Sequence, residues 1–335
     1  MSLMSVPVID LAPYLKGAPD GKRKVAEEVG RACRDIGFLT IIGHGVSDDL
    51  VENFYRSARE FFDLPVSEKI KIKQPRPDQV RGYSGVGEEG LSYSLDEPSP
   101  PDLKESLTFG PADVPPDDPY YRAPAAGQFF APTLWPSKPP ELKALGIAYF
   151  RAMEKLSAQL MRIFALALDL PEYFFDDKID KHISNLRILH YPNQPDEPEK
   201  GQLRAGAHSD YGSLTIVRQE EAPGGLQVLN LQGEWVDVKP IPHSFVVNIG
   251  DLMMQWTNDK WRSTMHRVVN PPRDKANSSR RLSLVFFHQP NYDALVNCLD
   301  SCCDAANPAK YPPITSGEHF IGKFVKQSTL GAGIA

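Results

Sequence analysis

The chain has 335 residues, of which 41% are hydrophobic and 24% are charged, and its formal net charge is −6. This composition is typical of a globular protein and excludes a largely disordered or membrane-embedded chain. No basic stripe is present, which argues against a nucleic-acid partner, and no apolar run is long enough to cross a bilayer. The first residues lack the basic and apolar segments of a signal peptide, so we expect a cytoplasmic protein.

Residues 1–115 predict an N-terminal region in which strands alternate with helices. Short apolar runs at 6–11 and 38–42 predict strands, and apolar residues at helical spacing predict helices over 22–36 and 48–62. Gly37 suits the end of the first helix, and Ser47 suits the N-cap of the second. This region is expected to pack on the rest of the chain.

Residues 116–180 predict a connecting loop followed by one long supporting helix. Residues 76–140 are rich in Gly, Pro and Asp, which favours long loops and short strands of the kind that often carry function. An apolar repeat predicts a helix over 140–168, which Pro171 terminates. We expect this helix to pack against the outside of a sheet.

Residues 181–292 have a different sequence pattern, in which short apolar runs are separated by turn residues. Seven runs predict strands, at 186–191, 214–219, 226–229, 234–238, 244–249, 266–269 and 281–288. Many short strands at regular spacing favour a double-sheet jelly roll. The predicted fold is therefore mainly β with flanking helices: a double-stranded β-helix (jelly-roll) core with an N-terminal α/β extension. Residues 293–335 predict a C-terminal tail with a short helix at 318–324.

Four cysteines are present, and their spacing is not that of a metal-binding motif. Cys33 falls in a helical pattern and is expected to be a core residue. Cys298, Cys302 and Cys303 cluster late in the chain without a regular C-x-x-C pair, so free thiols are favoured over a zinc site.

The densest group of chemically active residues lies between 204 and 283. His208 and Asp210 are two residues apart, and on a strand they would project from one face as neighbouring metal ligands. His266, 56 positions after Asp210, supplies a candidate third ligand. Two histidines and one carboxylate form the facial arrangement of non-haem Fe(II) oxygenases, which leaves open positions on the metal.

A second pair of residues predicts a carboxylate receptor. Arg281 and Ser283 lie 15 and 17 positions after His266 and would share one face of a strand. The guanidinium group offers two parallel donors and the hydroxyl a third, which suits an anionic carboxylate.

These motifs in this order resemble the Fe(II)- and 2-oxoglutarate-dependent dioxygenase superfamily, and more narrowly its isopenicillin N synthase-like branch. The resemblance extends over nearly the whole chain. It includes Ile9-Asp10-Leu11, the run from Gly37 to Gly45, Asp102-Leu-Lys-Glu105, and Asn248-Ile-Gly-Asp-Leu. Each motif alone is weak, but all of them together at family spacing are a specific signal.

The resemblance implies both a cofactor and a co-substrate. His208, Asp210 and His266 would hold Fe(II), while Arg281, Ser283 and Tyr191 would bind the distal carboxylate of 2-oxoglutarate. The implied reaction oxidises a small organic substrate with dioxygen, by hydroxylation, desaturation or ring closure, and releases succinate and CO2. The plant members carry Asn where this chain has Leu189, which weakens any transfer of their substrate specificity to this chain.

Candidate substrate residues follow from the same resemblance. Phe287 falls on the strand face of Ser283 and matches a pocket-lining position, and Arg187 could meet an acidic substrate group. Tyr83, Tyr93 and Phe109 are further candidates for pocket walls. A core or surface role is an equally good interpretation of each.

Three other functions fit part of the pattern. An isopenicillin N synthase-like Fe(II) oxidase would use the same triad with O2 but without 2-oxoglutarate, and its Arg281 would bind the substrate. A zinc hydrolase could use the same ligands, but no general-base glutamate stands at a fixed spacing beside them. A non-catalytic binding module would be expected to have lost a ligand or the arginine, and none is missing.

Overall fold

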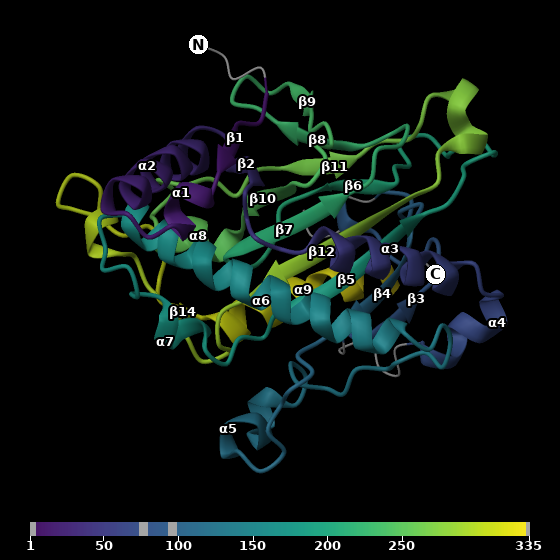
Figure 1. Ribbon diagram of the computed structural model, residues 1–335, viewed down its shortest axis with the longest axis horizontal. Helices are drawn as coiled ribbons and strands as arrows, with labels where there is room; N and C mark the ends of the chain where they lie inside the picture. The colour runs from purple at the N-terminus through teal and green to yellow at the C-terminus, as the bar shows by residue number, and fades with distance from the viewer. Residues whose placement is uncertain (1–4, 74–79, 93–98, 333–335) are drawn as a thin grey trace.

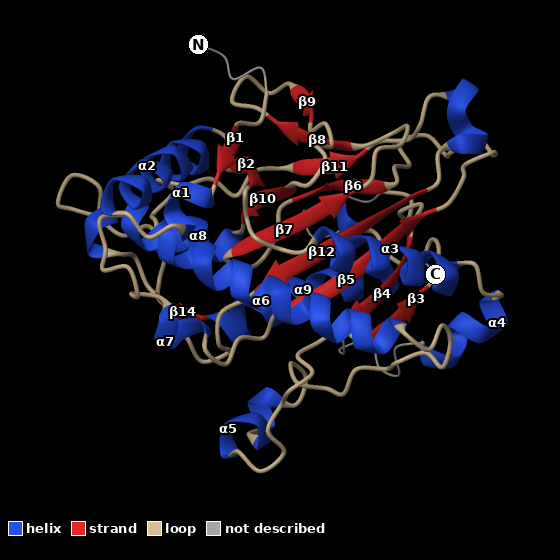
Figure 2. Cartoon of the chain, viewed as in Figure 1, coloured by secondary structure: helices blue, strands red, loops and turns tan. Residues whose placement is uncertain are grey.

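A computed structural model describes residues 5–73, 80–92 and 99–332 of the protein. Its centre is a large sheet that takes strands from both halves of the chain (Figures 1 and 2). In spatial order these are β1 (Val8–Asp10), β2 (Phe38–Ile42), β10 (Phe245–Ile249), β7 (Leu214–Gln219), β12 (Arg281–His288), β5 (Asn185–Tyr191), β4 (Glu105–Phe109) and β3 (Gly82–Ser84).

A smaller sheet lies beside the large one and completes the jelly roll. It contains β6 (Ala205–His208), β11 (His266–Val268), β8 (Leu226–Leu229) and β9 (Trp235–Asp237), in that order. A separate two-stranded ribbon joins β13 (Leu295–Val296) to β14 (Ile314–Thr315). All the strand pairs of the two main sheets are antiparallel except that of β1 and β2.

Three long helices cover one face of the large sheet: α2 (Pro19–Asp35), α3 (Asp48–Phe62) and α6 (Leu142–Ala167). Figure 1 shows α6, in teal, running across the strands, and it contacts β7 and β12. The fourth long helix, α9 (Ser316–Ala332), follows the ribbon. The short helices are α1 (Ala12–Leu15), α4 (Val66–Lys69), α5 (Pro119–Arg122), α7 (Asp176–Ile179) and α8 (Asp251–Trp256). None of the described helices is long and apolar enough to cross a membrane.

The alternation of side chains along β5 and β12 separates the core from the pocket. Leu186 and Ile188 of β5, with Leu284 and Phe286 of β12, point into the main hydrophobic core beneath α6. The intervening residues of both strands line a pocket on the opposite face. Because the side-chain period of a strand is two, one strand can serve both surfaces.

Most predicted elements are confirmed. The strands at 38–42, 214–219, 226–229 and 281–288 and the helix at 48–62 have the predicted bounds. The Ser47 hydroxyl accepts a hydrogen bond from the Leu50 amide, as an N-cap does. Gly37 has a φ of +70°, and its amide bonds to the Ala32 carbonyl at the end of α2. The tail helix is longer than the predicted 318–324 and runs from Ser316 to Ala332.

The N-terminal region does not only pack on the core, as predicted, but also contributes strands to the large sheet. Strands β1 and β2 extend one side of the large sheet, and β3 and β4 form its other edge. The division into regions 1–115, 116–180, 181–292 and 293–335 stays a prediction, but the first and third regions share one hydrogen-bonded sheet.

A buried polar cluster fixes β3 and β4 to the rest of the sheet. The Glu105 carboxylate accepts hydrogen bonds from Lys69 Nζ at 2.7 Å, from His190 Nδ1 at 2.7 Å and from the Tyr83 hydroxyl. Arg280 Nε donates to His190 Nε2 at 2.8 Å, which leaves the imidazole proton on Nδ1, facing Glu105. Of the two interpretations of Tyr83, a pocket wall or a core residue, the structure shows the core residue.

We predict that Glu105→Gln lowers the free energy of unfolding by about 3 kcal/mol, because it leaves the buried Lys69 ammonium without an anionic partner. Denaturant unfolding at pH 7 measures the change. Glu88→Gln is the matched control, since its partner Lys73 is at the surface and exposed pairs contribute less than about 1 kcal/mol. Equal effects of the two substitutions would contradict the role given to Glu105.

The same cluster predicts a pH dependence. Burial would raise the pKa of Glu105, but hydrogen bonds from His190, Lys69 and Tyr83 lower it below its ordinary value. A depressed pKa in the folded state means that the stabilisation is complete above the unfolded pKa of about 4.3 and is lost as the pH falls below it. The difference in stability between wild type and Glu105→Gln should therefore shrink in acid.

Candidate functional site

A pocket lies between the inner face of the large sheet and the small sheet. Alternate residues of β5, β7 and β12 form its floor, β6, β8 and β11 of the small sheet contribute another wall, and α9 adds two aromatic rings. The floor residues include Arg187 and Tyr191 from β5, with Arg281, Ser283 and Phe287 from β12. Most of the predicted site residues therefore lie around this one pocket.

Three of the predicted side chains form a compact cluster on this pocket. His208, Asp210 and His266 each offer one ligand atom, and these atoms lie within 4.8 Å of one another. Nε2 of each histidine is 3.7 Å from Asp210 Oδ1. Among the described residues this is the one group of three or more His, Cys, Asp or Glu side chains close enough to share a metal ion.

The small sheet positions the two histidines. His208, the last residue of β6, pairs directly with His266, the first residue of β11. Each ring is held at Nδ1 by a backbone carbonyl, that of Gly206 at 2.8 Å for His208 and that of Thr264 at 3.1 Å for His266. With Nδ1 fixed in this way, Nε2 of each ring is directed at the cluster with its lone pair available.

Asp210 is placed differently from the prediction. Strand β6 ends at His208, so the two residues do not share a strand face; Asp210 occupies the turn that follows. Its backbone carbonyl accepts from the Asp251 amide at 2.7 Å, and its Oδ2 accepts from Asn248 Nδ2 at 2.7 Å. The two side chains therefore come together through the segment that follows β6 and not through a shared strand face.

A close approach of two glycines holds that turn. A Cβ atom on Gly250 would lie 2.2 Å from the carbonyl oxygen of Gly212, so a side chain at position 250 would displace the turn that carries Asp210. This accounts physically for the Asn248-Ile-Gly-Asp segment, in which the asparagine orients the carboxylate and the glycine admits the neighbouring chain.

The charge states of the cluster suit a cation. Burial, followed by the nearby His266, lowers the pKa of His208 well below its usual range. Burial would raise the pKa of Asp210, but His266, His208 and the Asn248 amide together lower it. At neutral pH the cluster therefore presents a carboxylate beside neutral imidazole, which is the form that binds metal ions.

Arg281 is a buried cation whose guanidinium forms no ion pair with any described carboxylate. It is 2% exposed, and its Nη2 donates to the Ser283 hydroxyl at 3.2 Å and to Gln219 Oε1 at 3.4 Å. Its Nε has no partner, and burial lowers its pKa. The Tyr191 ring lies 5.3 Å from the guanidinium carbon. Because the Arg281 guanidinium borders the pocket and lacks a counter-ion, it could bind an anion that enters there.

The candidate substrate residues divide into two groups. Phe287 and Arg187 line the pocket, whereas the pocket-lining residues of the described structure do not include Tyr83 or Phe109. Phe109 stacks on Trp135 in the main core. Tyr93 lies outside the described residues.

Sequence reasoning missed several residues of the pocket. Gln219 and Gln289 line it, and both could have been found by extending the strand alternation one step further. Phe320 and Phe324 of α9 also line it, and their spacing of four residues places them on one helical face. The sequence does not indicate which surface that helix covers.

Comparison with known proteins shows the family of the chain. Residues 6–138 match the model for the non-haem dioxygenase in morphine synthesis N-terminal region, and residues 182–290 match that of the 2OG-Fe(II) oxygenase superfamily. The 2-oxoglutarate-Fe(II) type oxidoreductase hxnY of Emericella nidulans is 36% identical, over 98% of this chain and 91% of its own. Homoarginine-6-hydroxylase 2-ODD-C23.1 of Arabidopsis thaliana is 34% identical, over 95% and 96%.

Solved structures give the same result. A full-length Neurospora crassa protein in complex with α-ketoglutarate and thymine is 31% identical, with a TM-score of 0.83 over 96% of each chain. A 2OG-Fe(II) oxygenase family protein from Caulobacter crescentus is 29% identical, with a TM-score of 0.82 over 97% of this chain and 99% of its own. The chain belongs to the 2OG-Fe(II) oxygenase superfamily. It is an Fe(II)- and 2-oxoglutarate-dependent oxygenase, which decides against the oxidase that uses no 2-oxoglutarate.

Proposed function

We propose that His208, Asp210 and His266 are the protein ligands of the Fe(II) ion. The proposal is supported by three ligand atoms within 4.8 Å, by backbone carbonyls that hold both imidazoles at Nδ1, and by an ionised carboxylate between them. Nitrogen and carboxylate oxygen ligands on one side of the ion match the donor set of non-haem Fe(II) oxygenases. Bound Fe(II) supplies the redox chemistry that couples reduction of dioxygen to decarboxylation of 2-oxoglutarate and oxidation of the substrate.

The proposed receptor for the distal carboxylate of 2-oxoglutarate is Arg281 with Ser283 and Tyr191. The single observation that carries this assignment is the buried guanidinium of Arg281, which has no carboxylate partner among the described residues and keeps an unpaired Nε. A dicarboxylate would neutralise that charge inside the pocket. The Tyr191 ring covers the guanidinium and keeps water away from the ion pair, which strengthens it.

The substrate is a small organic molecule that we place against Phe287 and Arg187. Phe287 pairs with Asn185 at one end of β5 and β12, and Arg281 pairs with Tyr191 at the other end. Six residues separate the two ends along β12, which is about 20 Å in a strand. The floor of the pocket therefore has separate sections for co-substrate and substrate. Relatives are named for homoarginine hydroxylation, and the Neurospora crassa structure is a thymine complex, so substrate identity differs among similar chains.

The decisive experiment for this function measures succinate formation from 2-oxoglutarate by the iron-loaded protein in air. We expect slow succinate production without added substrate and a faster rate when a substrate is present. Asp210→Ala should abolish both rates, because it removes the only anionic ligand. Asp237→Ala, a change at the exposed end of β9, is the control and should leave both rates unchanged. Full activity of the Asp210 variant would refute the ligand assignment.

We predict that His266→Ala weakens metal binding at least about 100-fold, because loss of an outer hydrogen-bond partner alone costs about 10–100-fold in metal affinity. Titration with Mn(II), followed by electron paramagnetic resonance, measures the dissociation constant without turnover. His243→Asn is the control: that imidazole is 71% exposed, and asparagine tolerates its φ of +55°. Unaltered Mn(II) affinity in His266→Ala would remove His266 from the site.

We predict that Arg281→Gln raises the dissociation constant of 2-oxoglutarate at least about tenfold, which corresponds to about 1.4 kcal/mol. Arg281→Lys should restore only part of the loss, because an ammonium group does not offer two parallel donors. Calorimetric titration of the Mn(II)-loaded protein measures both values. Arg267→Gln is the control, since that arginine donates to Gln227 and lies over Trp235. An unchanged affinity in Arg281→Gln would show that the co-substrate binds elsewhere.

A further inference from the structure

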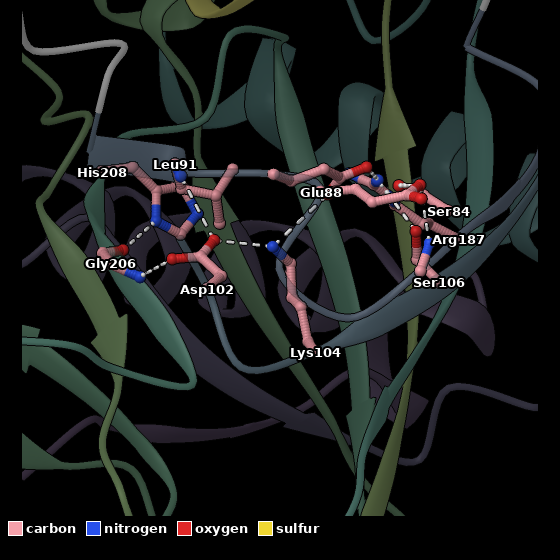
Figure 3. Close-up of polar contacts among 11 residues, drawn as sticks. Ser84, Glu88, Leu91, Asp102, Lys104, Ser106, Arg187, Gly206 and His208 are labelled. Carbon is pink, nitrogen blue, oxygen red and sulfur yellow. Dashed lines mark hydrogen bonds and ion pairs between the residues drawn. The ribbon is translucent and has the colours of Figure 1, made fainter. Parts of the chain in front are cut away.

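The buried carboxylate of Asp102 connects β6, the strand that ends at His208, to a neighbouring loop and to a buried lysine. Asp102 is 2% exposed. Its Oδ1 accepts a hydrogen bond from the Gly206 amide at 2.8 Å. Its Oδ2 accepts from Lys104 Nζ at 2.6 Å and from the Leu91 amide at 3.2 Å. Figure 3 shows the carboxylate among these groups, with the His208 ring beside Gly206.

Gly206 lies where the ladder between β6 and β11 is irregular. Ala205 of β6 pairs with Val268 of β11. The next pair joins His208 to His266, so β6 advances three residues while β11 advances two. This is the pattern of a β-bulge, which leaves one residue without a ladder partner and re-aims the side chains beside it. The amide that the carboxylate binds therefore belongs to the bulge that precedes the His208 ring.

Gly206 supports the His208 ring through its other backbone group. Its carbonyl accepts from His208 Nδ1 at 2.8 Å, so the conformation of Gly206 decides where that ring points. A Cβ atom on Gly206 would collide with the Ser92 hydroxyl, which restricts this position to glycine. Glycine has the greatest backbone freedom of all residues. A hydrogen bond from its amide to a buried carboxylate removes part of that freedom.

The same carboxylate holds the loop that packs against the bulge. The Asp102 amide donates to the Glu89 carbonyl at 2.7 Å, and the Leu91 amide donates to the Asp102 side chain. Ser92, the residue in contact with the bulge, follows directly. The Lys104 ammonium lies 2.6 Å from the Asp102 carboxylate and 3.4 Å from that of Glu89. One carboxylate therefore fixes both the bulge and the loop beside it.

We propose that Asp102 is a positioning residue for the metal site, because its hydrogen bond to the Gly206 amide fixes the bulge that aims the His208 imidazole at the metal ion. Asp102 is not a ligand itself and acts through Gly206. The inference rests on the proposed role of His208 as a ligand. Outer groups that hold a histidine ligand in place contribute to metal affinity, so loss of this carboxylate should weaken metal binding.

The test replaces Asp102 with Asn, which keeps the size of the side chain and removes its charge. Burial would lower the pKa of Lys104, but Asp102 and Glu89 raise it. The lysine is therefore a cation that attracts the single amide oxygen of Asn, and the NH2 group then faces the Gly206 amide, donor against donor. We expect the Mn(II) dissociation constant, measured by electron paramagnetic resonance, to rise about tenfold, the lower end of the range for outer partners of metal ligands.

A second readout reports the geometry of the ligands. The visible absorption bands of bound Co(II) depend on the arrangement of its ligands, so they should shift in Asp102→Asn. A loss of stability alone would leave the bands of the folded, fully loaded protein unchanged. The proposal requires both changes: wild-type Mn(II) affinity or an unchanged Co(II) spectrum overturns it.

Two control substitutions separate positioning from charge and from stability. Glu89→Gln removes one negative charge from the same network but leaves the bond between Asp102 and Gly206 in place. Glu105→Gln removes a carboxylate that is 5% exposed and whose hydrogen bonds, described above, fix β3 and β4. Both variants should keep the wild-type Mn(II) dissociation constant and Co(II) spectrum. A loss of affinity in either control as large as in Asp102→Asn would overturn the proposal.

Asp102→Glu keeps the experiment decisive if the asparagine variant does not fold. It retains the negative charge beside Lys104, but its longer side chain cannot keep the present contacts with both Lys104 and the Gly206 amide. Mn(II) affinity should therefore fall and the Co(II) bands should shift, although the charge is unchanged. Wild-type values of both in Asp102→Glu overturn the proposal.

His208→Ala distinguishes failure of this inference from failure of the ligand assignment. Full Mn(II) affinity in His208→Ala would refute the assignment of His208 as a ligand, and the role of Asp102 with it. If His208→Ala loses Mn(II) while both Asp102 variants bind it normally with an unchanged Co(II) spectrum, the ligand assignment stands and the role of Asp102 is refuted. Thermal unfolding of each variant confirms that the comparisons are made on folded protein.

Discussion

The whole arrangement depends on the two faces of β5 and β12. One face is mainly apolar and packs under α6, where residues such as Ile188 and Phe286 are fully buried. The other face holds Arg187, Arg281 and Ser283 at positions that a strand of period two must direct away from the core. Burial of the apolar face therefore stabilises the sheet and also directs the polar side chains of the other face into the pocket.

The two arginines on that face differ in the partners that surround their guanidinium groups. Arg187 and Arg281 belong to neighbouring strands and line the same pocket. Arg187 has an internal carboxylate partner in Glu89, whereas Arg281 has neutral partners in Ser283 and Gln219. A buried cation without a counter-ion attracts an anion, but a compensated one offers only hydrogen bonds. The same residue type therefore presents an uncompensated positive charge at one point of the pocket and a compensated one at another.

The sequence predicted β7 and β12 well because their signals are local, but it did not predict β6, the short strand that ends at His208. Alternating apolar residues specify β7 and β12, and the capping serine specifies the start of α3. The sequence left open whether Tyr83 lies in the core or beside the pocket, because its partner Glu105 lies 22 residues away in the chain and no local pattern reports that contact. Asp210 lies beyond the end of β6, next to the point where Gly212 and Gly250 approach each other, again a contact between distant segments. The contributions of Gln289 and α9 to the pocket likewise depend on tertiary packing.

The direct pairing of His208 with His266 across β6 and β11 has a consequence for how the small sheet forms. A slip of one residue in that ladder would turn one imidazole to the opposite face, because neighbouring side chains in a strand point in opposite directions. Only the native register brings both rings together. In their proposed role as ligands, the two histidines would bind a metal ion strongly only in that register, so metal binding would draw the population toward correctly paired molecules. The two histidines would then favour the native strand register of the small sheet to which they belong.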